Sequence, residues 1–160
     1  MRIMVCYEFH RSACFCSSSI RAFVKNQLNN GKIIGACITV HKAIGPGLLE
    51  SAYEACVGYE LSGLGLQFER QKPVPLIYHS VKLDCGFRAD LVVEGLVVVE
   101  LKSRESLHPV DHAQLLSHLR LLQLTVGLLI NFHVTVLKDG ITRMVNDYQE
   151  EPDAKVEITY

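Results

Sequence analysis

Charged residues interrupt an apolar run in the middle of the chain, over residues 96–102. The run reads Leu-Val-Val-Val-Glu-Leu-Lys, so Glu100 and Lys102 stand where a buried strand is expected. A buried carboxylate is costly unless it is paired or binds a metal ion. Asp90 lies in the preceding apolar segment, across a short turn. The pattern predicts two neighbouring strands that bring two acids and a lysine together.

The turn between these strands decides whether Asp90 and Glu100 share a face of the sheet. Residues directly opposite each other in a hairpin share a face. Asp90 is opposite Glu100 only if the turn holds an odd number of residues, such as Glu94-Gly95-Leu96, because a two-residue turn would pair Asp90 with Val99. Three-residue turns with a glycine are common, and a bulge near Ala89 would have the same effect. The expected strand ends leave Glu94-Gly95 as the turn, so a shared face for the two acids requires either an odd turn that includes Leu96 or a bulge.

Two carboxylates and an ammonium group on one face support two interpretations. Carboxylate oxygens suit Mg²⁺ or Mn²⁺, and such an ion polarises a phosphate and lowers the pKa of a bound water. A neighbouring lysine can orient or deprotonate that water. The alternative is an ion pair of Lys102 with Glu100 or Asp90 at a strand end, and the spacing taken alone favours this ion pair.

Two further polar residues lie near the starts of expected helices. Glu50 falls in the first turn of a helix over 48–62, where the helix dipole stabilises an acid, and Tyr53 shares its face. Gln114 precedes a leucine stripe in a helix over 106–124, where an amide could hold a water or a phosphate oxygen. The alternative for Glu50 is a purely electrostatic role at the start of its helix, and the alternative for Gln114 is a solvated side chain. Each alternative is favoured when its residue is considered alone.

The rest of the pattern predicts an α/β domain with helices packed against a sheet. A first helix is expected from Lys32 to the residue before Gly45-Pro46-Gly47. The expected strands are an edge strand over 73–78, strands over 81–85, 87–93, 96–101 and 126–132, and a hairpin of 134–137 with 141–145 around Asp139-Gly140.

Three segments divide the chain. Residues 1–30 are expected to be a poorly ordered extension, residues 31–148 the α/β domain, and residues 149–160 a charged tail. The extension contains Cys6, His10, Cys14 and Cys16, but their spacing matches no common zinc module, so a zinc site there is the less favoured alternative.

Composition excludes several classes of protein. The 160 residues fit one domain, and no apolar run is long enough to span a membrane. A net charge of −1 argues against binding nucleic acid by charge alone, although a bound cation would add local positive charge. The six cysteines, without a convincing secretory signal, indicate a reducing cytoplasmic location.

The segments together resemble the GxxExxY proteins, which belong to the PD-(D/E)XK nuclease-like superfamily. Gly47-Leu48-Leu49-Glu50-Ser51-Ala52-Tyr53 matches the Gly-x-x-Glu-x-x-Tyr signature. The resemblance runs from about Lys32 to Asn146 and includes Arg88-Ala89-Asp90-Leu91, Val99-Glu100-Leu101-Lys102, Ala113-Gln114-Leu115-Leu116 and Gly127-Leu128-Leu129-Ile130-Asn131-Phe132. His118 departs from the pattern, because a tyrosine is usual at its position.

The resemblance implies a restriction-endonuclease-like core, a mixed β-sheet flanked by helices. It implies that Asp90, Glu100 and the Leu101 carbonyl bind Mg²⁺ or Mn²⁺, with Glu50 as a further acid acting directly or through water. It implies that Lys102 positions the attacking water and that Gln114 completes the site. Tyr53, Arg88 and His41 would support these groups.

The leading hypothesis is therefore a metal-dependent nuclease that cleaves phosphodiester bonds in DNA or RNA. The alternative is a catalytically silent module on the same fold that binds nucleic acid or a protein. A purely structural role of the charged strand ends is a third possibility. We expect nucleic acid as the partner, no membrane, and a homodimer or a protein partner for specificity.

Overall fold

The computed structural model describes residues 17–79, 81–83 and 86–146. Its elements are the helices α1 (Ser17–Ile44), α2 (Glu50–Gly63) and α3 (Pro109–Leu121), the 3-10 helix η1 (Leu137–Gly140), and the strands β1 (Phe68–Pro73), β2 (Leu76–Tyr78), β3 (Val81–Leu83), β4 (Arg88–Val93), β5 (Val97–Lys102), β6 (Val126–Asn131) and β7 (Ile141–Val145). No helix in these ranges combines the length and the apolarity that crossing a membrane would require.

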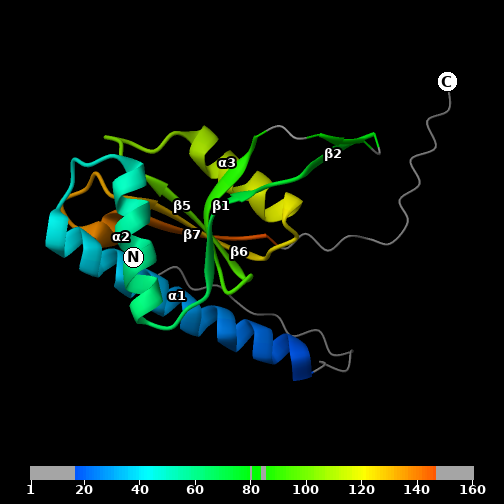
Figure 1. Ribbon diagram of the computed structural model, residues 1–160, viewed down its shortest axis with the longest axis horizontal. Coiled ribbons are helices and arrows are strands. Elements are labelled where there is room, and N and C mark those ends of the chain that lie inside the picture. The colour runs from blue at the N-terminus through cyan, green and yellow to red at the C-terminus, as the bar shows by residue number, and fades with distance from the viewer. Residues whose placement is uncertain (1–16, 80, 84–85, 147–160) are drawn as a thin grey trace, which may run out of the picture.

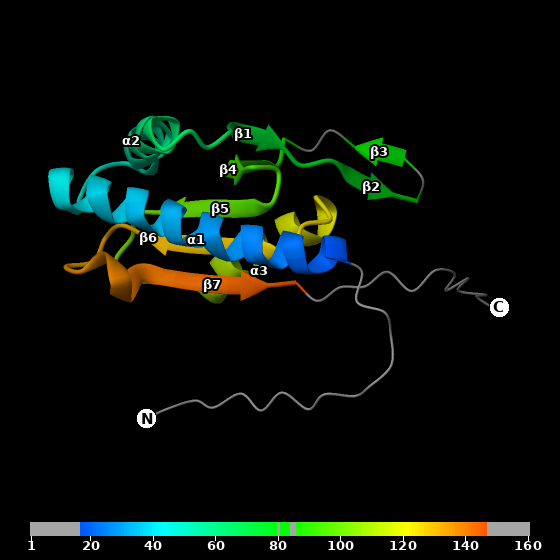
Figure 2. The ribbon, with the colours of Figure 1, turned by 90° about the horizontal axis from the view of Figure 1, so that it is seen from below.

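A five-stranded mixed sheet forms the centre of the molecule, in the order β1-β4-β5-β6-β7 (Figure 1). Strands β5 and β6 are parallel, and the other neighbours are antiparallel. Helix α3 connects the parallel pair, as a crossover must. Helices α1 and α2 cover one face of the sheet and α3 the other, while β2 and β3 form a separate hairpin beyond the sheet (Figures 1 and 2). The predicted α/β class is confirmed.

The turn between β4 and β5 has an odd length, which was the condition for Asp90 and Glu100 to lie on one face. Leu91 is paired with Val99 and Val93 with Val97, so residues 94–96 form a three-residue turn. Glu94 and Gly95 both have positive φ, at 56° and 64°, which lets the strands reverse over so few residues. Continuing this register places Asp90 opposite Glu100.

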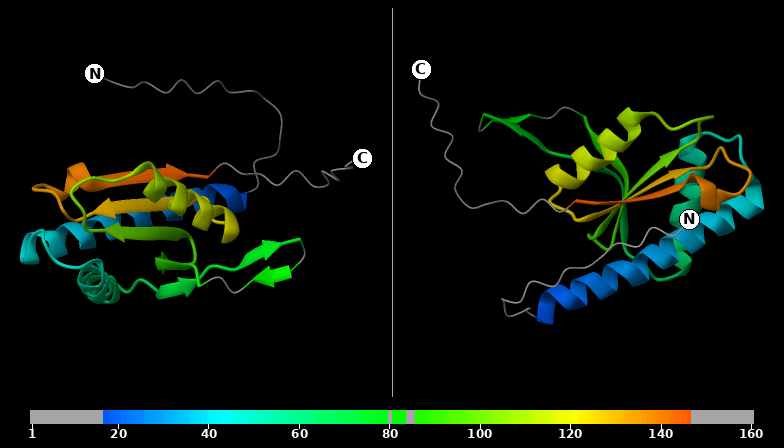
Figure 3. Two further views of the ribbon diagram at one scale, coloured as in Figure 1. Left: turned by 90° about the horizontal axis from the view of Figure 1, so that it is seen from above. Right: turned by 180° about the vertical axis from the view of Figure 1, so that it is seen from behind.

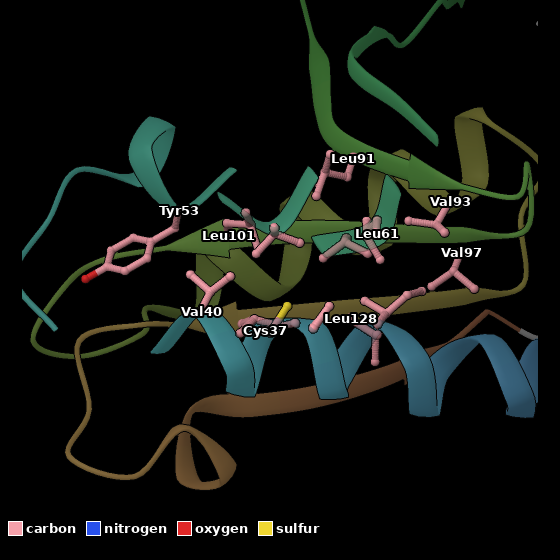
Figure 4. Packing of buried hydrophobic residues seen from close by; sticks show 14 of the residues in the cluster. Cys37, Val40, Tyr53, Leu61, Leu91, Val93, Val97, Leu101 and Leu128 are labelled. Atoms are coloured by element: carbon pink, nitrogen blue, oxygen red, sulfur yellow. The ribbon is translucent and has the colours of Figure 1, made fainter. Parts of the chain in front are cut away.

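The larger core lies between the sheet and the pair α1 and α2 (Figure 4). Side chains from both helices and from the central strands meet there, among them Cys37, Tyr53, Leu91 and Leu101. The Tyr53 ring stacks on Phe132 with their centroids 4.2 Å apart. A smaller apolar cluster packs under α3 and contains Val74, Ala89, Val92, Val98, Leu115, Leu119 and Leu129. The sheet therefore has two cores of unequal size.

Three element predictions need correction. Helix α1 begins at Ser17, well before the expected start at Lys32, because a nucleated helix can extend without apolar periodicity. Strand β1 was not expected, since Phe68–Pro73 is largely exposed and shows no alternation. The predicted hairpin around Asp139-Gly140 is wrong: these residues lie in η1, and β7 pairs with β6 instead. An isolated hairpin is marginal, whereas β7 extends the main sheet.

A smaller difference concerns a helix boundary. Helix α2 begins at Glu50, two residues after the expected start at residue 48, and Leu49 before it is 78% exposed. Cys6, His10, Cys14 and Cys16, the weighed zinc ligands, lie outside the described residues.

Candidate active site

Strands β4 and β5 separate directly after the pair of Leu91 and Val99, and this fork is where the site begins. Strand β4 continues alongside β1 to Arg88, while β5 continues alongside β6 to Lys102. Figure 4 shows the strand that carries Leu91 curving away from the strand that carries Leu101. Asp90 bridges the gap, because its Oδ2 accepts a hydrogen bond of 2.8 Å from the Leu101 backbone N–H. The Asp90 carboxylate thus accepts the hydrogen bond that a backbone carbonyl of a paired strand would otherwise accept.

Glu100 lies on the α3 face of β5 and is fully buried. His118 Nδ1 lies 2.7 Å from its Oε1, and Gln114 Nε2 donates to its Oε2 at 3.3 Å. Gln114 and His118 are one helical turn apart on α3, so they reach the same strand residue. Helix α3 therefore supplies the groups that hold the Glu100 carboxylate.

Lys102 shares this face with Glu100, as the period of a strand requires. Its Nζ donates to Gln114 Oε1 at 3.3 Å and lies 3.7 Å from Glu100 Oε2. The side chain is only 8% exposed. An ammonium group carries three N–H donors, and the hydrogen bond to Gln114 uses one of them, while Glu100 is an ion-pair partner at 3.7 Å. The ammonium group can therefore also donate to a water or a phosphate oxygen.

The Asp90 carboxyl has its pKa raised to about 6, first by burial and then by the negative charge of Glu100. Glu54 adds to this effect, while the Leu101 N–H and the Lys102 ammonium act in the opposite direction. Lys102 therefore does not fully neutralise the acids around the fork. A site with excess negative charge at partly buried carboxylates is suited to a cation.

The donor set at the fork fits a Mg²⁺-type ion. Asp90 and Glu100 supply carboxylate oxygens, and no group of three or more His, Cys, Asp or Glu side chains in the described part of the chain is arranged to hold a metal. Mg²⁺ is commonly held by one or two carboxylates and completes its shell with waters and substrate phosphates. A closed zinc site would need four protein ligands. The fork can accordingly hold a hard cation that shares its shell with substrate.

Glu50 contacts the two residues that follow Lys102 at the end of β5. Its Oε1 accepts a hydrogen bond of 3.1 Å from the Ser103 N–H and lies 3.7 Å from the Arg104 guanidinium. The Ser103 hydroxyl in turn donates to the Leu48 carbonyl at 2.6 Å. These contacts fasten the start of α2 to the strand end that carries Lys102, which gives Glu50 a structural role whatever else it does.

Tyr53 has a comparable role within the signature segment. Its hydroxyl donates to the Gly45 carbonyl at 2.7 Å and accepts from the Leu48 N–H at 3.1 Å. It thereby closes the loop between α1 and α2, in which Gly45 and Gly47 have φ of 67° and 103°. The glycines and the tyrosine of the signature together fix the loop that delivers Glu50.

The other predicted supporting residues divide between the site and the scaffold. Arg88 Nη1 donates to the Gln71 carbonyl at 3.0 Å, which ties β4 to β1 beside Asp90. His41 Nε2 lies 2.8 Å from the Val134 carbonyl and secures the segment that follows β6. Arg88 thus belongs to the neighbourhood of the fork, whereas His41 supports the fold.

Sequence reasoning missed Glu54, the α2 acid whose charge acts on Asp90. Its side chain is 6% exposed and pairs with Arg70 Nε at 2.8 Å. Gln71 Nε2 donates to Glu54 Oε2 at 2.6 Å and lies 3.4 Å from Asp90 Oδ1, so its amide links the two acids. Gln71 has φ of 48°, an unfavourable conformation for a non-glycine residue. The available signal was the i, i+4 spacing of Glu54 from Glu50.

His118 was noted in the sequence only as a departure from the family pattern. The structure places it 3% exposed against Glu100, where it holds one carboxylate oxygen. Its i, i+4 spacing from Gln114 was the signal that could have identified it.

Comparison with known proteins adds one finding. The model of the PD-(D/E)XK nuclease superfamily matches residues 27–144, which include all the fork residues. No curated protein matches the chain. No solved structure matches it either.

Proposed function

Because the chain belongs to the PD-(D/E)XK nuclease superfamily, we propose that it is a metal-dependent nuclease whose site is the fork between β4 and β5. The observation that carries this proposal is the convergence of Asp90, Glu100, Lys102 and Gln114 at the point where the two strands part. The narrower resemblance to the GxxExxY proteins remains a prediction.

Asp90 and Glu100 would hold a divalent cation, Mg²⁺ or Mn²⁺, with the Leu101 carbonyl as a further ligand. When bound, the ion would polarise the scissile phosphate and lower the pKa of a water beside it. His118 holds Glu100 Oε1, so the carboxylate keeps a fixed orientation. Preorganised ligands of this kind cost little rearrangement when substrate arrives.

Lys102 would orient the attacking water and offset the charge that develops on the phosphate. In hydrolysis, the water oxygen forms a bond to phosphorus, the bond from phosphorus to one sugar oxygen breaks, and that oxygen leaves with a proton. Gln114 contacts both Lys102 and Glu100, so it sets their relative positions. Glu50 would act from the end of β5, through water or through Arg104.

Cleavage assays test the proposal. Purified protein is incubated with single-stranded, duplex and branched DNA and RNA, with Mg²⁺ or Mn²⁺ and with EDTA. We expect cleavage that requires the ion and that falls by at least about a hundredfold in Lys102→Met. Lys138→Met is the matched control, because Lys138 is exposed on η1.

Two results would contradict the proposal. Cleavage that persists in EDTA or in folded Lys102→Met would place the activity elsewhere. If no substrate is cut while nucleic acid is bound in a manner that Glu100→Ala does not affect, the fold serves as a silent binding module.

A further inference from the structure

A groove of about 710 Å³ lies between α3 and the base of the β2–β3 hairpin. Its walls are mainly apolar and include Leu76, Phe87, Val110 and Leu121. Gln114 and His118 also line it, and both contact Glu100. Figure 3 shows the hairpin standing out from the sheet beside α3. The groove is therefore separated from Glu100 only by the side chains of Gln114 and His118. Its volume lies in the range of small-molecule binding sites.

Large apolar side chains around this groove remain exposed. Phe87 is 50% exposed and Val110 is 66% exposed. Scattered apolar residues on a surface need no explanation, but several around one concavity mark a binding site. An aromatic ring with aliphatic neighbours is suited to a flat apolar ligand.

Positive charge lies beside these apolar walls. A second cavity of about 550 Å³ shares Phe87 with the groove and is lined by Arg88 and by Lys72, whose Nζ pairs with Glu69 Oε1 at 2.6 Å. Arg88 precedes Asp90 by two residues on β4, so the guanidinium belongs to the approach to the fork. Along the surface, the apolar groove is followed by Phe87 and then by the cationic side chains of Lys72 and Arg88. A ligand with flat bases and a phosphate backbone has the matching order of groups.

We propose that the groove binds one unstacked nucleobase next to the scissile phosphate, so that the substrate is single-stranded or splayed nucleic acid. This inference rests on the proposed function, because it places the base relative to the phosphate at the fork. Phe87 stacks on the base, Gln114 and Ser117 reach its polar edge, and Lys72 and Arg88 contact the neighbouring phosphates. A base inside a duplex would first have to leave its stack, which opposes binding.

Binding without cleavage tests this inference separately from the nuclease activity. Fluorescence anisotropy in EDTA compares single-stranded DNA, single-stranded RNA and a blunt duplex of the same sequence. We expect both single strands to bind at least about tenfold more tightly than the duplex. Phe87→Ala should weaken single-strand binding about tenfold, the effect of losing one stacked base, and Phe87→Tyr should retain it.

Two further variants complete the design. Tyr59→Ala is the matched control, because Tyr59 is an exposed aromatic residue on α2, and it should bind as the parent does. Ala113→Glu adds a negative charge to the groove at an exposed helical position and should weaken binding as Phe87→Ala does. Its helical position tolerates glutamate, so the protein should fold even if Phe87→Ala does not.

The outcomes distinguish the two proposals. Equal binding of duplex and single strands, or unchanged binding in Phe87→Ala and Ala113→Glu, overturns the groove inference even if the protein cuts nucleic acid. Binding that depends on Phe87 without any metal-dependent cleavage supports the groove and overturns the proposed nuclease.

Discussion

The two faces of strand β5 are equally buried but differ in what they bury. Val97, Val99 and Leu101 pack into the core beneath α1 and α2, whereas Val98, Glu100 and Lys102 lie toward α3. The first face is stabilised by removing apolar area from water. The second contains two ionised groups whose desolvation is costly unless they are paired. Equal burial therefore does not mean equal contributions to stability.

The two faces also differ in what their polar groups contact. A buried ion pair is often no more stabilising than apolar residues of the same volume. The chain nevertheless keeps Glu100, Lys102, Gln114 and His118 in mutual contact beneath α3. On the other face, polar groups such as the Tyr53 hydroxyl satisfy backbone atoms of a loop. On β5 itself, the polar side chains Glu100 and Lys102 both lie on the α3 face, where they contact each other and Gln114.

The largest expected effect comes from breaking the polar face at one residue. Glu100→Ala leaves Lys102 without its carboxylate partner, so the free energy of unfolding should fall by about 3–5 kcal/mol. The double variant Glu100→Leu/Lys102→Met should recover most of this loss, because it removes both charges. Urea denaturation of the parent, the single variant and the double variant measures these free energies of unfolding.

Leu101→Ala is the comparison on the opposite face, where the loss of about 2–5 kcal/mol arises from a cavity. If Glu100→Leu/Lys102→Met were as unstable as Glu100→Ala, the unpaired charge of Lys102 would not explain the loss of stability in Glu100→Ala.

A second prediction concerns the fit of a helix on each face. A Cβ at Gly127 would lie 2.7 Å from Leu115 Cδ1, so Gly127→Ala should push α3 away and cost about 1–3 kcal/mol. Gly58→Ala is its counterpart on α2, where the nearest atom is in the Phe68 ring at 3.2 Å. Alanine favours a helix by about 1 kcal/mol over glycine, which offsets this closer contact, so Gly58→Ala should be nearly neutral. Thermal unfolding of both variants measures the effect, and an equal loss of stability in Gly127→Ala and Gly58→Ala would contradict the prediction.

The third prediction is a pH dependence of the metal-free protein. The Asp90 carboxyl holds its proton up to pH about 6 in the fold but releases it near its ordinary pKa of 3.8 when unfolded. The folded state thus binds more protons between these values, and the free energy of unfolding falls as pH rises through them. At pH 7, Asp90→Asn should therefore stabilise the protein by about 1–2 kcal/mol.

Denaturation in EDTA at pH 4.5 and pH 7 tests this prediction, and the gain should be confined to the higher pH. Mg²⁺ should stabilise the parent and not Asp90→Asn. A variant that is less stable than the parent at pH 7 would contradict the excess of negative charge at the fork.

The smallest effect concerns reactivity. Cys37 lies in the core beneath α1, and burial raises the pKa of its thiol to about 12. The thiolate is the reactive form, so Cys37 should resist alkylation in the folded protein and react in urea. Cys56 is partly exposed and is the internal comparison. Mass spectrometry after iodoacetamide treatment measures both, and rapid labelling of Cys37 would show that this face opens readily.

The sequence identified the charged residues of the fork because their pattern is local, but it left the length of the turn open. The length of the turn over 94–96 sets the register of Asp90 against Glu100 without reference to the rest of the chain. The alternation of Val98, Glu100 and Lys102 places three side chains on one face for the same reason. The role of Gln114 was harder to predict, because its contacts with Glu100 and Lys102 depend on how α3 packs against β5.

The residues that the sequence did not reveal depend on distant contacts. Glu54 is buried because β1 brings Arg70 and Gln71 to it, and β1 has no strand pattern of its own. Strand β7 was assigned to a local hairpin, since the open edge of β6 cannot be recognised in the sequence. Tertiary pairing determines both outcomes.

The hydrogen bond from the Leu101 N–H to Asp90 makes one amide proton a built-in reporter of the site. Its NMR chemical shift depends on the charge of the carboxylate that accepts it, and its exchange with solvent requires the fork to open. Leu101 lies between Glu100 and Lys102 on β5. A single backbone resonance can therefore follow protonation, cation binding and local opening at the centre of the fork, with no label attached to the protein surface.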